Sequence, residues 1–141
     1  MLQGEYHYTL DEKWRVVIPQ KFRRALGDVV TVTRNPLDPC LFVFSQEEWS
    51  RVAQKLASLP LVERQFVRFL TSGVVECELD RQGRIVLPAH LREYAQIDRE
   101  AVVIGVINRV EIWSEGNWRA NLEKTQADSS QLLVRLQELI L

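Results

Sequence analysis

Two short segments of the chain pair an aspartate with an arginine four residues later. Asp11 precedes Arg15, Asp80 precedes Arg84, and in each case three aliphatic residues and a proline follow the arginine. An arginine guanidinium donates hydrogen bonds from a planar fork, which matches a phosphate group or the edge of a guanine. The chemistry that these residues offer is therefore recognition of phosphates or bases.

The residues between each aspartate and its arginine predict a tight turn. Aspartate suits the start of a turn because its carboxylate can accept backbone N–H bonds two residues on. In the second segment Gly83 supplies a position that needs a positive φ, and Arg81 lies in the same turn as Arg84. In the first segment Trp14 takes the glycine's place, where a left-handed backbone would cost about 1–2 kcal/mol. Either that turn has another geometry or it stores strain, and Trp14 either stacks on a sugar or base or packs against protein. The residues expected to shape the turns are Asp11, Trp14, Asp80 and Gly83.

The charge of the chain is nearly balanced overall but uneven along its length. Eighteen lysines and arginines face nineteen acids, which gives a net charge of −1. Residues 13–24 nevertheless contain no acid. A basic surface of this kind is typical of nucleic-acid binding, although a solvated charged face explains the same pattern. The cations of this run are Lys13, Arg15, Lys21, Arg23 and Arg24.

The similarity of the two segments continues beyond their prolines and predicts one structural unit written twice. A proline favours the first position of a helix, so short helices are expected over 20–25 and 89–94. Two β-rich runs separated by turn residues follow each helix and predict a hairpin. Ser45, with Glu48 three residues later, predicts the capped start of a further helix, and Ser114 holds the matching place. Each unit is therefore strand, helix, hairpin and helix.

This organisation divides the chain into two repeats and two helical segments. Polar residues at 126–130 predict a loop within the last segment. The apolar stripes at 62–70 and 132–140 are candidates for core or for interface, and the sequence does not divide those roles. The expected boundaries are 5–48 for the first repeat, 49–73 for a helical connector, 76–119 for the second repeat and 120–141 for a C-terminal helical tail.

Several classes of protein fit this sequence poorly. No apolar run approaches the roughly 18 residues of a membrane span, and no signal peptide is evident, so a cytoplasmic protein is expected. Cys40 and Cys77 lack metal-ligand spacing and are expected as buried thiols. The sequence shows no nucleophile–base pair and no phosphate-cradling glycine loop. We therefore expect no enzyme, metal, cofactor or small-molecule substrate.

The motifs together resemble the MraZ family of bacterial transcription regulators. The resemblance lies in the paired Asp–Arg–proline motifs, in Arg23 and Arg92 after the two prolines, and in Trp49 and Trp118 on the helices that follow the hairpins. It covers nearly the whole chain. It implies two SpoVT-AbrB-like repeats and an α+β, mainly β fold. The implied fold is a pseudo-two-fold, swapped-hairpin (double-psi-like) β-barrel of two intertwined repeats with flanking helices.

The resemblance also implies a function and a state of assembly. Members of this family form ring-shaped homo-oligomers that bind direct repeats in double-stranded promoter DNA. They usually repress the cell-division and cell-wall gene cluster, including their own gene, and such a protein would associate with the nucleoid. By the resemblance, Lys13 and Arg15 contact DNA, and Arg84 is their counterpart in the second motif. The family usually has glycine at the position of Trp14, so the resemblance does not fix the geometry of this tip.

Two functions follow as hypotheses. The first is a sequence-specific DNA-binding regulator, whose expected DNA-binding residues are Lys13, Arg15, Lys21, Arg23, Arg24, Arg81 and Arg84. The second is an AbrB-type antitoxin or a protein-assembly module, which would bind a partner protein through the apolar stripe at 132–140.

Overall fold

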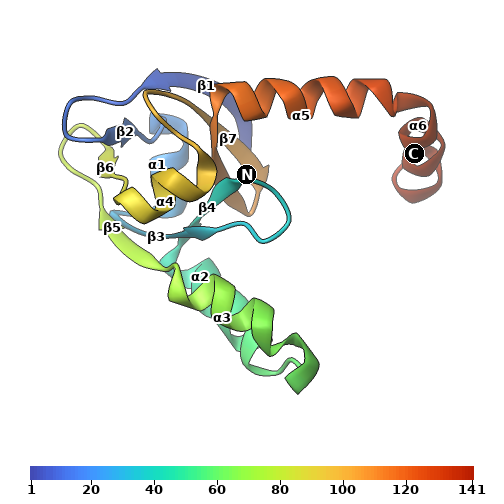
Figure 1. The fold of residues 1–141 in the computed structure, drawn as a ribbon, viewed down its shortest axis with the longest axis horizontal. Coiled ribbons are helices and arrows are strands. Elements are labelled where there is room, and N and C mark those ends of the chain that lie inside the picture. Colours follow the sequence, from blue (N-terminus) through green and yellow to red (C-terminus); the bar gives the residue numbers. More distant parts are fainter.

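A mainly β body carries two helical arms that leave it in different directions (Figure 1). The computed structural model describes the backbone of residues 1–141 and the side chains of all of them except Ser129. In this described part, none of the helices has the length and apolar character needed to cross a membrane. The first arm contains α2 (Gln46–Ala57), the 3-10 helix η1 (Leu61–Glu63) and α3 (Arg64–Ser72), and the second contains α5 (Glu115–Ala127) and α6 (Ser129–Leu139).

The body is built on a six-stranded antiparallel sheet to which both repeats contribute. Its order is β1-β7-β8-β4-β3-β5, and β4 pairs with β8 so that the hairpins of the two repeats are joined side by side. The strands are β1 (Leu2–Thr9), β3 (Val29–Arg34), β4 (Cys40–Ser45), β5 (Val75–Glu78), β7 (Glu100–Ile107) and β8 (Arg109–Ser114).

The leading strand of each repeat pairs with the hairpin of the other repeat. β1 comes before the first Asp–Arg turn, yet it pairs along its whole length with β7, from Leu2 opposite Ile107 to Thr9 opposite Glu100. β5 comes before the second turn, yet it pairs with β3, with Val29 opposite Glu78. Because of this exchange, neither repeat has a complete sheet of its own.

A second sheet consists of only two strands, which directly follow the two turns. These are β2 (Arg15–Val17) and β6 (Arg84–Val86), paired antiparallel with Val16 opposite Ile85. Two further bonds extend the pairing, because the Ile18 N–H donates to the Gly83 carbonyl and the Leu87 N–H donates to the Trp14 carbonyl.

The α+β class is as predicted, but the prediction of a closed β-barrel is wrong. The six-stranded sheet is open and ends at β1 and β5. Each of β2 and β6 has three residues, because a turn precedes it and a proline follows one residue after it. Proline has no N–H to continue a ladder, so each strand ends before its proline. The two short strands pair with each other and not with an edge of the six-stranded sheet.

The helices begin where the sequence predicts. α1 (Gln20–Leu26) and α4 (Ala89–Ala95) follow the two prolines. The Ser45 hydroxyl accepts the Glu48 N–H at the start of α2, and the Ser114 hydroxyl accepts the Asn117 N–H at the start of α5. The loop predicted at 126–130 is wrong, since α5 continues to Ala127 and α6 begins at Ser129.

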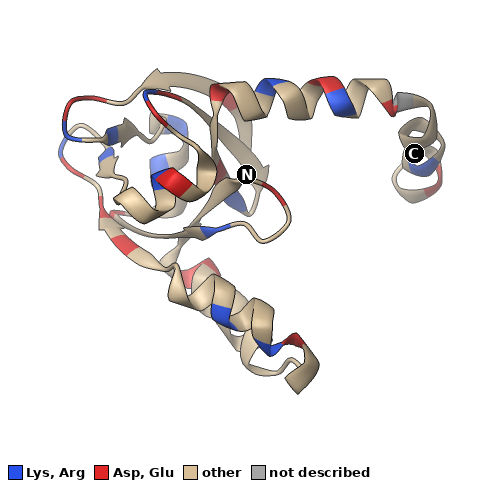
Figure 2. Ribbon diagram, viewed as in Figure 1, with Lys and Arg blue, Asp and Glu red and all other residues tan. Residues whose placement is uncertain are grey.

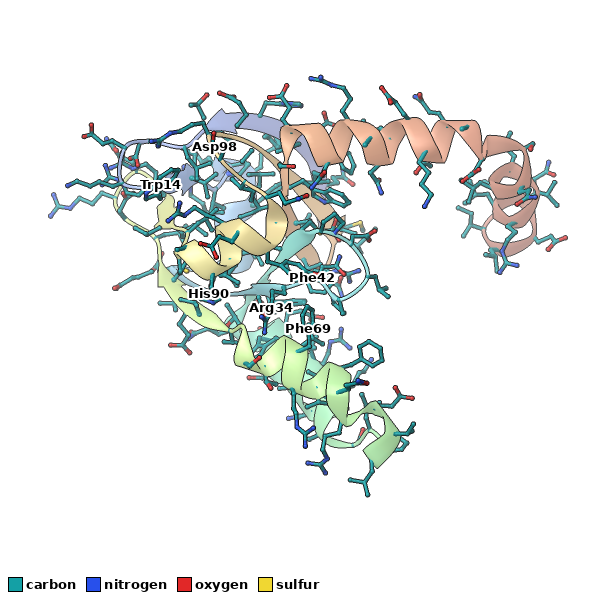
Figure 3. The ribbon with its side chains drawn as sticks, in the orientation of Figure 1. Trp14, Arg34, Phe42, Phe69, His90 and Asp98 are labelled. Carbon is teal, nitrogen blue, oxygen red and sulfur yellow. The ribbon has the colours of Figure 1, made fainter. Side chains whose placement is uncertain are left out.

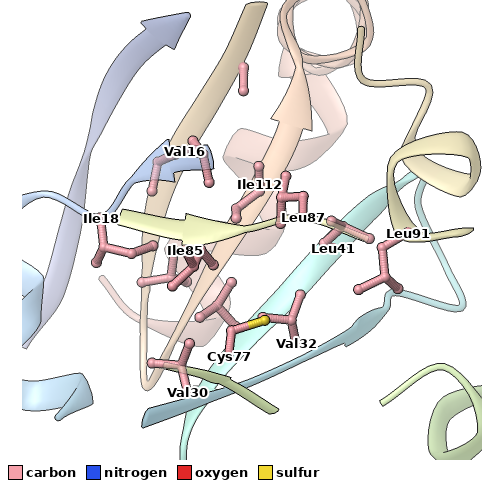
Figure 4. Packing of buried hydrophobic residues seen from close by; sticks show 14 of the residues in the cluster. Val16, Ile18, Val30, Val32, Leu41, Cys77, Ile85, Leu87, Leu91 and Ile112 are labelled. Atoms are coloured by element: carbon pink, nitrogen blue, oxygen red, sulfur yellow. The ribbon is translucent and has the colours of Figure 1, made fainter. Parts of the chain in front are cut away.

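The core fills the space between the two sheets and the short helices (Figure 4). Val16 and Ile18 of the first repeat and Ile85 and Leu87 of the second are completely buried in it. Burying such a side chain contributes about 1.5–3 kcal/mol. The residues that directly follow Arg15 and Arg84 are therefore anchored, and this fixes where the two arginines leave the body.

The two apolar stripes lie outside this core. On the first arm Val62 is 80% exposed and Phe66 is 51% exposed, and on α6 Leu133 is 61% exposed. The sequence left two roles open for the stripes, core or interface. Their exposure excludes the core of the single chain for these residues.

Candidate functional site

The two Asp–Arg turns form neighbouring tips at the end of the body away from α6 (Figure 1). We call residues 11–15 the first tip and residues 80–84 the second tip. In the first tip, one oxygen of Asp11, Oδ1, accepts the backbone N–H groups of Lys13 and Arg15, each at 2.9 Å. The other oxygen, Oδ2, accepts the Arg15 Nε–H at 2.6 Å. A single carboxylate thus closes the turn and orients its arginine.

The second tip repeats this arrangement. Asp80 Oδ1 accepts the backbone N–H groups of Gln82 and Arg84, and Oδ2 accepts the Arg84 Nε–H, each at 2.9 Å. The hydrogen bond from the arginine backbone is the main reason why the pKa of each aspartate lies below its ordinary value, with Arg15 acting on Asp11 and Arg84 on Asp80. Both carboxylates are therefore held ionised.

This arrangement leaves the end of Arg15 available to a ligand. Its side chain is 26% exposed, and only Nε is hydrogen-bonded within the described part of the chain. The two terminal Nη groups, which make the forked contacts of arginine, have no partner there. Arg15 is thus oriented from one side while its fork remains open.

Trp14 adopts the left-handed backbone that the second tip gives to glycine. Its φ is 59°, close to the 74° of Gly83, and each residue donates its N–H to the carbonyl of the aspartate three residues before it. Of the two alternatives for this turn, the strained one is therefore correct. A conformation that costs about 1–2 kcal/mol for a side-chain-bearing residue persists only where its surroundings hold it.

Two arginines hold the Trp14 ring. The Cζ atoms of Arg92 and Arg99 lie 3.9 and 4.0 Å from the ring centroid. Both guanidinium groups therefore lie within cation–π distance of the one indole. The Arg99 Nη1 also donates to the Asp11 carbonyl, and the Arg92 Nε donates to the Leu87 carbonyl. Each cation–π contact contributes about 0.5–1 kcal/mol at an exposed site, which is enough to offset the backbone strain.

Arg23 covers the second tip in a different way. Its Nε donates to the Ile18 carbonyl at 2.8 Å and its Nη2 donates to the Gln82 carbonyl at 2.9 Å. Its guanidinium lies directly over Gly83, where an added Cβ would come within 1.9 Å of Cζ. Arg23, expected as a DNA contact, is thus largely occupied in fastening the first repeat to the second tip.

The other expected cations are exposed. Lys13 lies on the first tip, Arg81 on the second, and Lys21 and Arg24 on α1, and none of the four forms an ion pair with a described residue. Figure 2 shows basic residues of both tips gathered at this end of the body, with acidic residues beside them. Glu12 is one of these acids.

The sequence interpretation missed Arg92 and Arg99 as part of this site. Arg92 is the repeat counterpart of Arg23, so an alignment of the repeats contained its signal. Arg99 has no arginine counterpart in the first repeat, and only the folded chain brings it to Trp14. Figure 3 shows Trp14 at the end of the body away from α6.

The chemistry that these side chains offer is hydrogen bonding and positive charge. The described side chains contain no group of three or more histidine, cysteine or acidic residues placed to hold a metal ion. Burial raises the pKa of the Cys77 thiol to about 11 and also raises that of Cys40, so neither thiol is a ready nucleophile. A set of oriented and exposed cations on rigid turns can bind an anionic polymer.

Comparison with known proteins gives one consistent family. The family model described as "MraZ protein, putative antitoxin-like" matches twice, at residues 1–72 and 70–139. A relative named transcriptional regulator MraZ from Moorella thermoacetica is 52% identical over 128 residues, which cover 89% of each chain. Relatives of the same name from Desulforamulus reducens and Halothermothrix orenii are 48% and 45% identical, over 99% of this chain and 100% and 99% of their own lengths.

Proposed function

Because this chain belongs to the MraZ family, we propose that it is a transcription regulator that binds double-stranded promoter DNA through its two tips. The observation that carries the proposal is the pair of aspartate-oriented arginines at one end of the body. Arg15 and Arg84 are held through Nε on rigid turns, and those turns are fixed by buried neighbours. Groups oriented in advance lose little freedom on binding, which favours specific recognition.

The roles of the cations follow from their settings. Arg15 has an open fork and suits a base edge, where one good contact contributes about 1–3 kcal/mol of discrimination. Lys13, Arg81, Lys21 and Arg24 are exposed and suit phosphates, which position the protein without reading sequence. A narrow β-structured tip can enter the major groove as a helix does.

The proposal includes a ring-shaped homo-oligomer that binds direct repeats. A pair of tips on one subunit is small, and a net charge of −1 gives no bulk attraction to DNA. Several tips must therefore act together, each at a high effective concentration. The exposed apolar residues of the two arms, such as Phe66 and Leu133, supply surfaces through which subunits would join head to tail and close a ring.

The finer points of fold and biology belong to the same proposal. The exchange of β1 and β5 between repeats supports the swapped-hairpin relationship that the family resemblance implies. The chain would act as a repressor at the promoter of the cell-division and cell-wall gene cluster, its own gene included, and would be found on the nucleoid.

The test is a titration of the purified chain against its own upstream promoter fragment. Saturable binding that is much tighter than binding to a shuffled fragment of equal length is the expected result. Inserting about 5 bp between two repeats turns one site to the opposite face, so affinity should fall to nearly that of one repeat, and a further 5 bp should partly restore it. Equal affinity for promoter and shuffled DNA would contradict the proposal, and indifference to spacing would contradict its multi-tip part.

An antitoxin or protein-assembly role is the second candidate, favoured by the exposed apolar face of α6. It predicts that the chain forms a stoichiometric complex with a partner protein and that substitution of Leu133 by Glu abolishes the complex. If Leu133→Glu instead binds DNA weakly, with the affinity expected for a single repeat, this face of α6 makes contacts between subunits.

A further inference from the structure

The two tips share a backbone geometry but differ in how their covering arginines are used. At the second tip Arg23 lies over Gly83 and gives two of its nitrogens to backbone carbonyls. Its repeat counterpart at the first tip, Arg92, makes the matching bond to the carbonyl before the proline, Leu87. A matching second bond, to the Lys13 carbonyl, is absent from the described contacts, and the Arg92 guanidinium instead lies 3.9 Å from the centroid of the Trp14 ring.

Arg92 is therefore displaced from the turn onto the indole of Trp14. Only its Nε is hydrogen-bonded within the described part of the chain, so both Nη groups remain open. Arg99 also contacts the indole, and within the described part of the chain only its Nη1 is hydrogen-bonded, to the Asp11 carbonyl. Neither arginine forms an ion pair with a described acid, although Asp98 and Glu100 flank Arg99 in the sequence.

A guanidinium stacked on an aromatic face is held flat with its hydrogen-bonding edge outward. Such a guanidinium loses less conformational entropy on binding an anion than an arginine side chain that is free in solvent. The first tip thus presents Arg15 together with two further guanidinium groups in fixed positions. The second tip presents Arg84 and the exposed Arg81, with Arg23 turned inward.

We propose that Trp14 makes the first tip the stronger DNA-binding tip, by holding Arg92 and Arg99 against its ring as additional phosphate-binding groups beside Arg15. This inference rests on the proposed function. Trp14 is a positioning residue here, and Arg92 and Arg99 make the contacts. The strained backbone of Trp14 is then explained, because the two arginines need an aromatic ring at this position and glycine cannot supply one.

The test measures affinity for the upstream promoter fragment over a range of salt concentrations. Trp14→Gly keeps the turn, since glycine accepts a positive φ, but it removes the indole that both arginines contact. Affinity should fall about tenfold or more at moderate salt, and the slope of log K against log salt should shrink by one to two units, at about 0.9 unit for each phosphate contact. Trp14→Phe keeps an aromatic ring and should retain most of the affinity and most of the salt slope. Arg119→Gln removes one positive charge from α5, far from the tips, and should match the wild type.

A double variant, Arg92→Gln with Arg99→Gln, leaves Trp14 and the turn in place and should shrink the slope by a similar amount. If circular dichroism shows that Trp14→Gly does not fold, the double variant alone tests the inference. Wild-type affinity and slope in the double variant, or in a folded Trp14→Gly, would overturn the inference.

The Arg15→Ala variant separates this inference from the proposed function. If Arg15→Ala loses operator binding while the Trp14 and Arg92/Arg99 variants bind as the wild type does, the inference alone fails. If the wild type does not distinguish promoter from shuffled DNA, the proposed function fails.

Discussion

The Nη1 of Arg84 lies 3.5 Å from Oδ2 of Asp11, a residue 73 positions earlier in the chain. The same Asp11 oxygen accepts the Nε–H of Arg15. The carboxylate of the first tip therefore contacts the arginines of both tips, whereas among the described contacts Asp80 bonds to a single arginine, Arg84. The two tips are consequently one electrostatic unit, and its shared member is Asp11.

The first prediction compares the two aspartates. Asp11→Asn replaces one acceptor oxygen with a donor, which removes the charge that orients Arg15 and Arg84 together. Asp80→Asn removes only the contact to Arg84. We expect Asp11→Asn to reduce operator affinity several-fold more than Asp80→Asn, measured by fluorescence anisotropy with the promoter fragment. If the two variants lose the same amount of operator affinity, the contact between Asp11 and Arg84 does not contribute to DNA binding.

The second prediction concerns acid. Hydrogen bonding lowers the pKa of Asp11 and Asp80 in the folded chain. A lowered folded pKa contributes stability at pH values above the unfolded pKa, which is about 3.9, and this contribution is lost as pH falls through the folded pKa. Urea unfolding should therefore show stability falling below about pH 4. The double variant Asp11→Asn with Asp80→Asn should be less stable at neutral pH, and its free energy of unfolding should decrease less as the pH is lowered below about 4. If the double variant loses as much stability in acid as the wild type, the two aspartates are not the cause.

The third prediction concerns the crowding of Gly83. Alanine there would keep a φ of 74° and place its Cβ against the Arg23 guanidinium. Gly83→Ala should destabilise the chain by about 1–3 kcal/mol, from the left-handed backbone and the displaced arginine. Combining it with Arg23→Ala removes the clash, so the double variant should lose less stability than the sum of the two single variants. Strict additivity in thermal or urea unfolding would show that the two residues do not interact.

Sequence reasoning reached the parts of this site that depend on local chemistry. Turn closure by Asp11 and the helix starts at Pro19 and Ser45 depend on residues within a few positions, so their patterns were visible in the chain. The backbone of Trp14 was not decidable, since its strain is offset by arginines that are distant in sequence. The inward use of Arg23 was also out of reach, because its Gln82 partner is 59 residues away.

The same limit explains the errors in the fold. Nothing in the sequence of residues 2–9 indicates that they pair with β7 of the other repeat. Closure of a barrel depends on long-range pairing of this kind. The short β2 and β6 left the six-stranded sheet open, and their length follows from the turn and proline that bound each of them.

The fourth prediction concerns the exposed cations of α1. Lys21 and Arg24 form no ion pair with a described residue and are proposed to bind phosphates. Replacing either by glutamine should lower the slope of log K against log salt by about 0.9 unit and should weaken promoter and shuffled DNA alike. Loss of promoter preference with unchanged binding to shuffled DNA would assign these residues to base recognition.

The most direct test of the account is the affinity of Arg15→Ala for the upstream promoter fragment. Arg15 is the arginine whose fork is open and whose orientation is fixed by Asp11. Loss of one good base contact costs about 1–3 kcal/mol, so operator affinity should fall at least about tenfold, while the oligomer measured by light scattering and the melting temperature stay close to wild type. Wild-type affinity in a folded, assembled Arg15→Ala variant would contradict recognition of DNA by the tips.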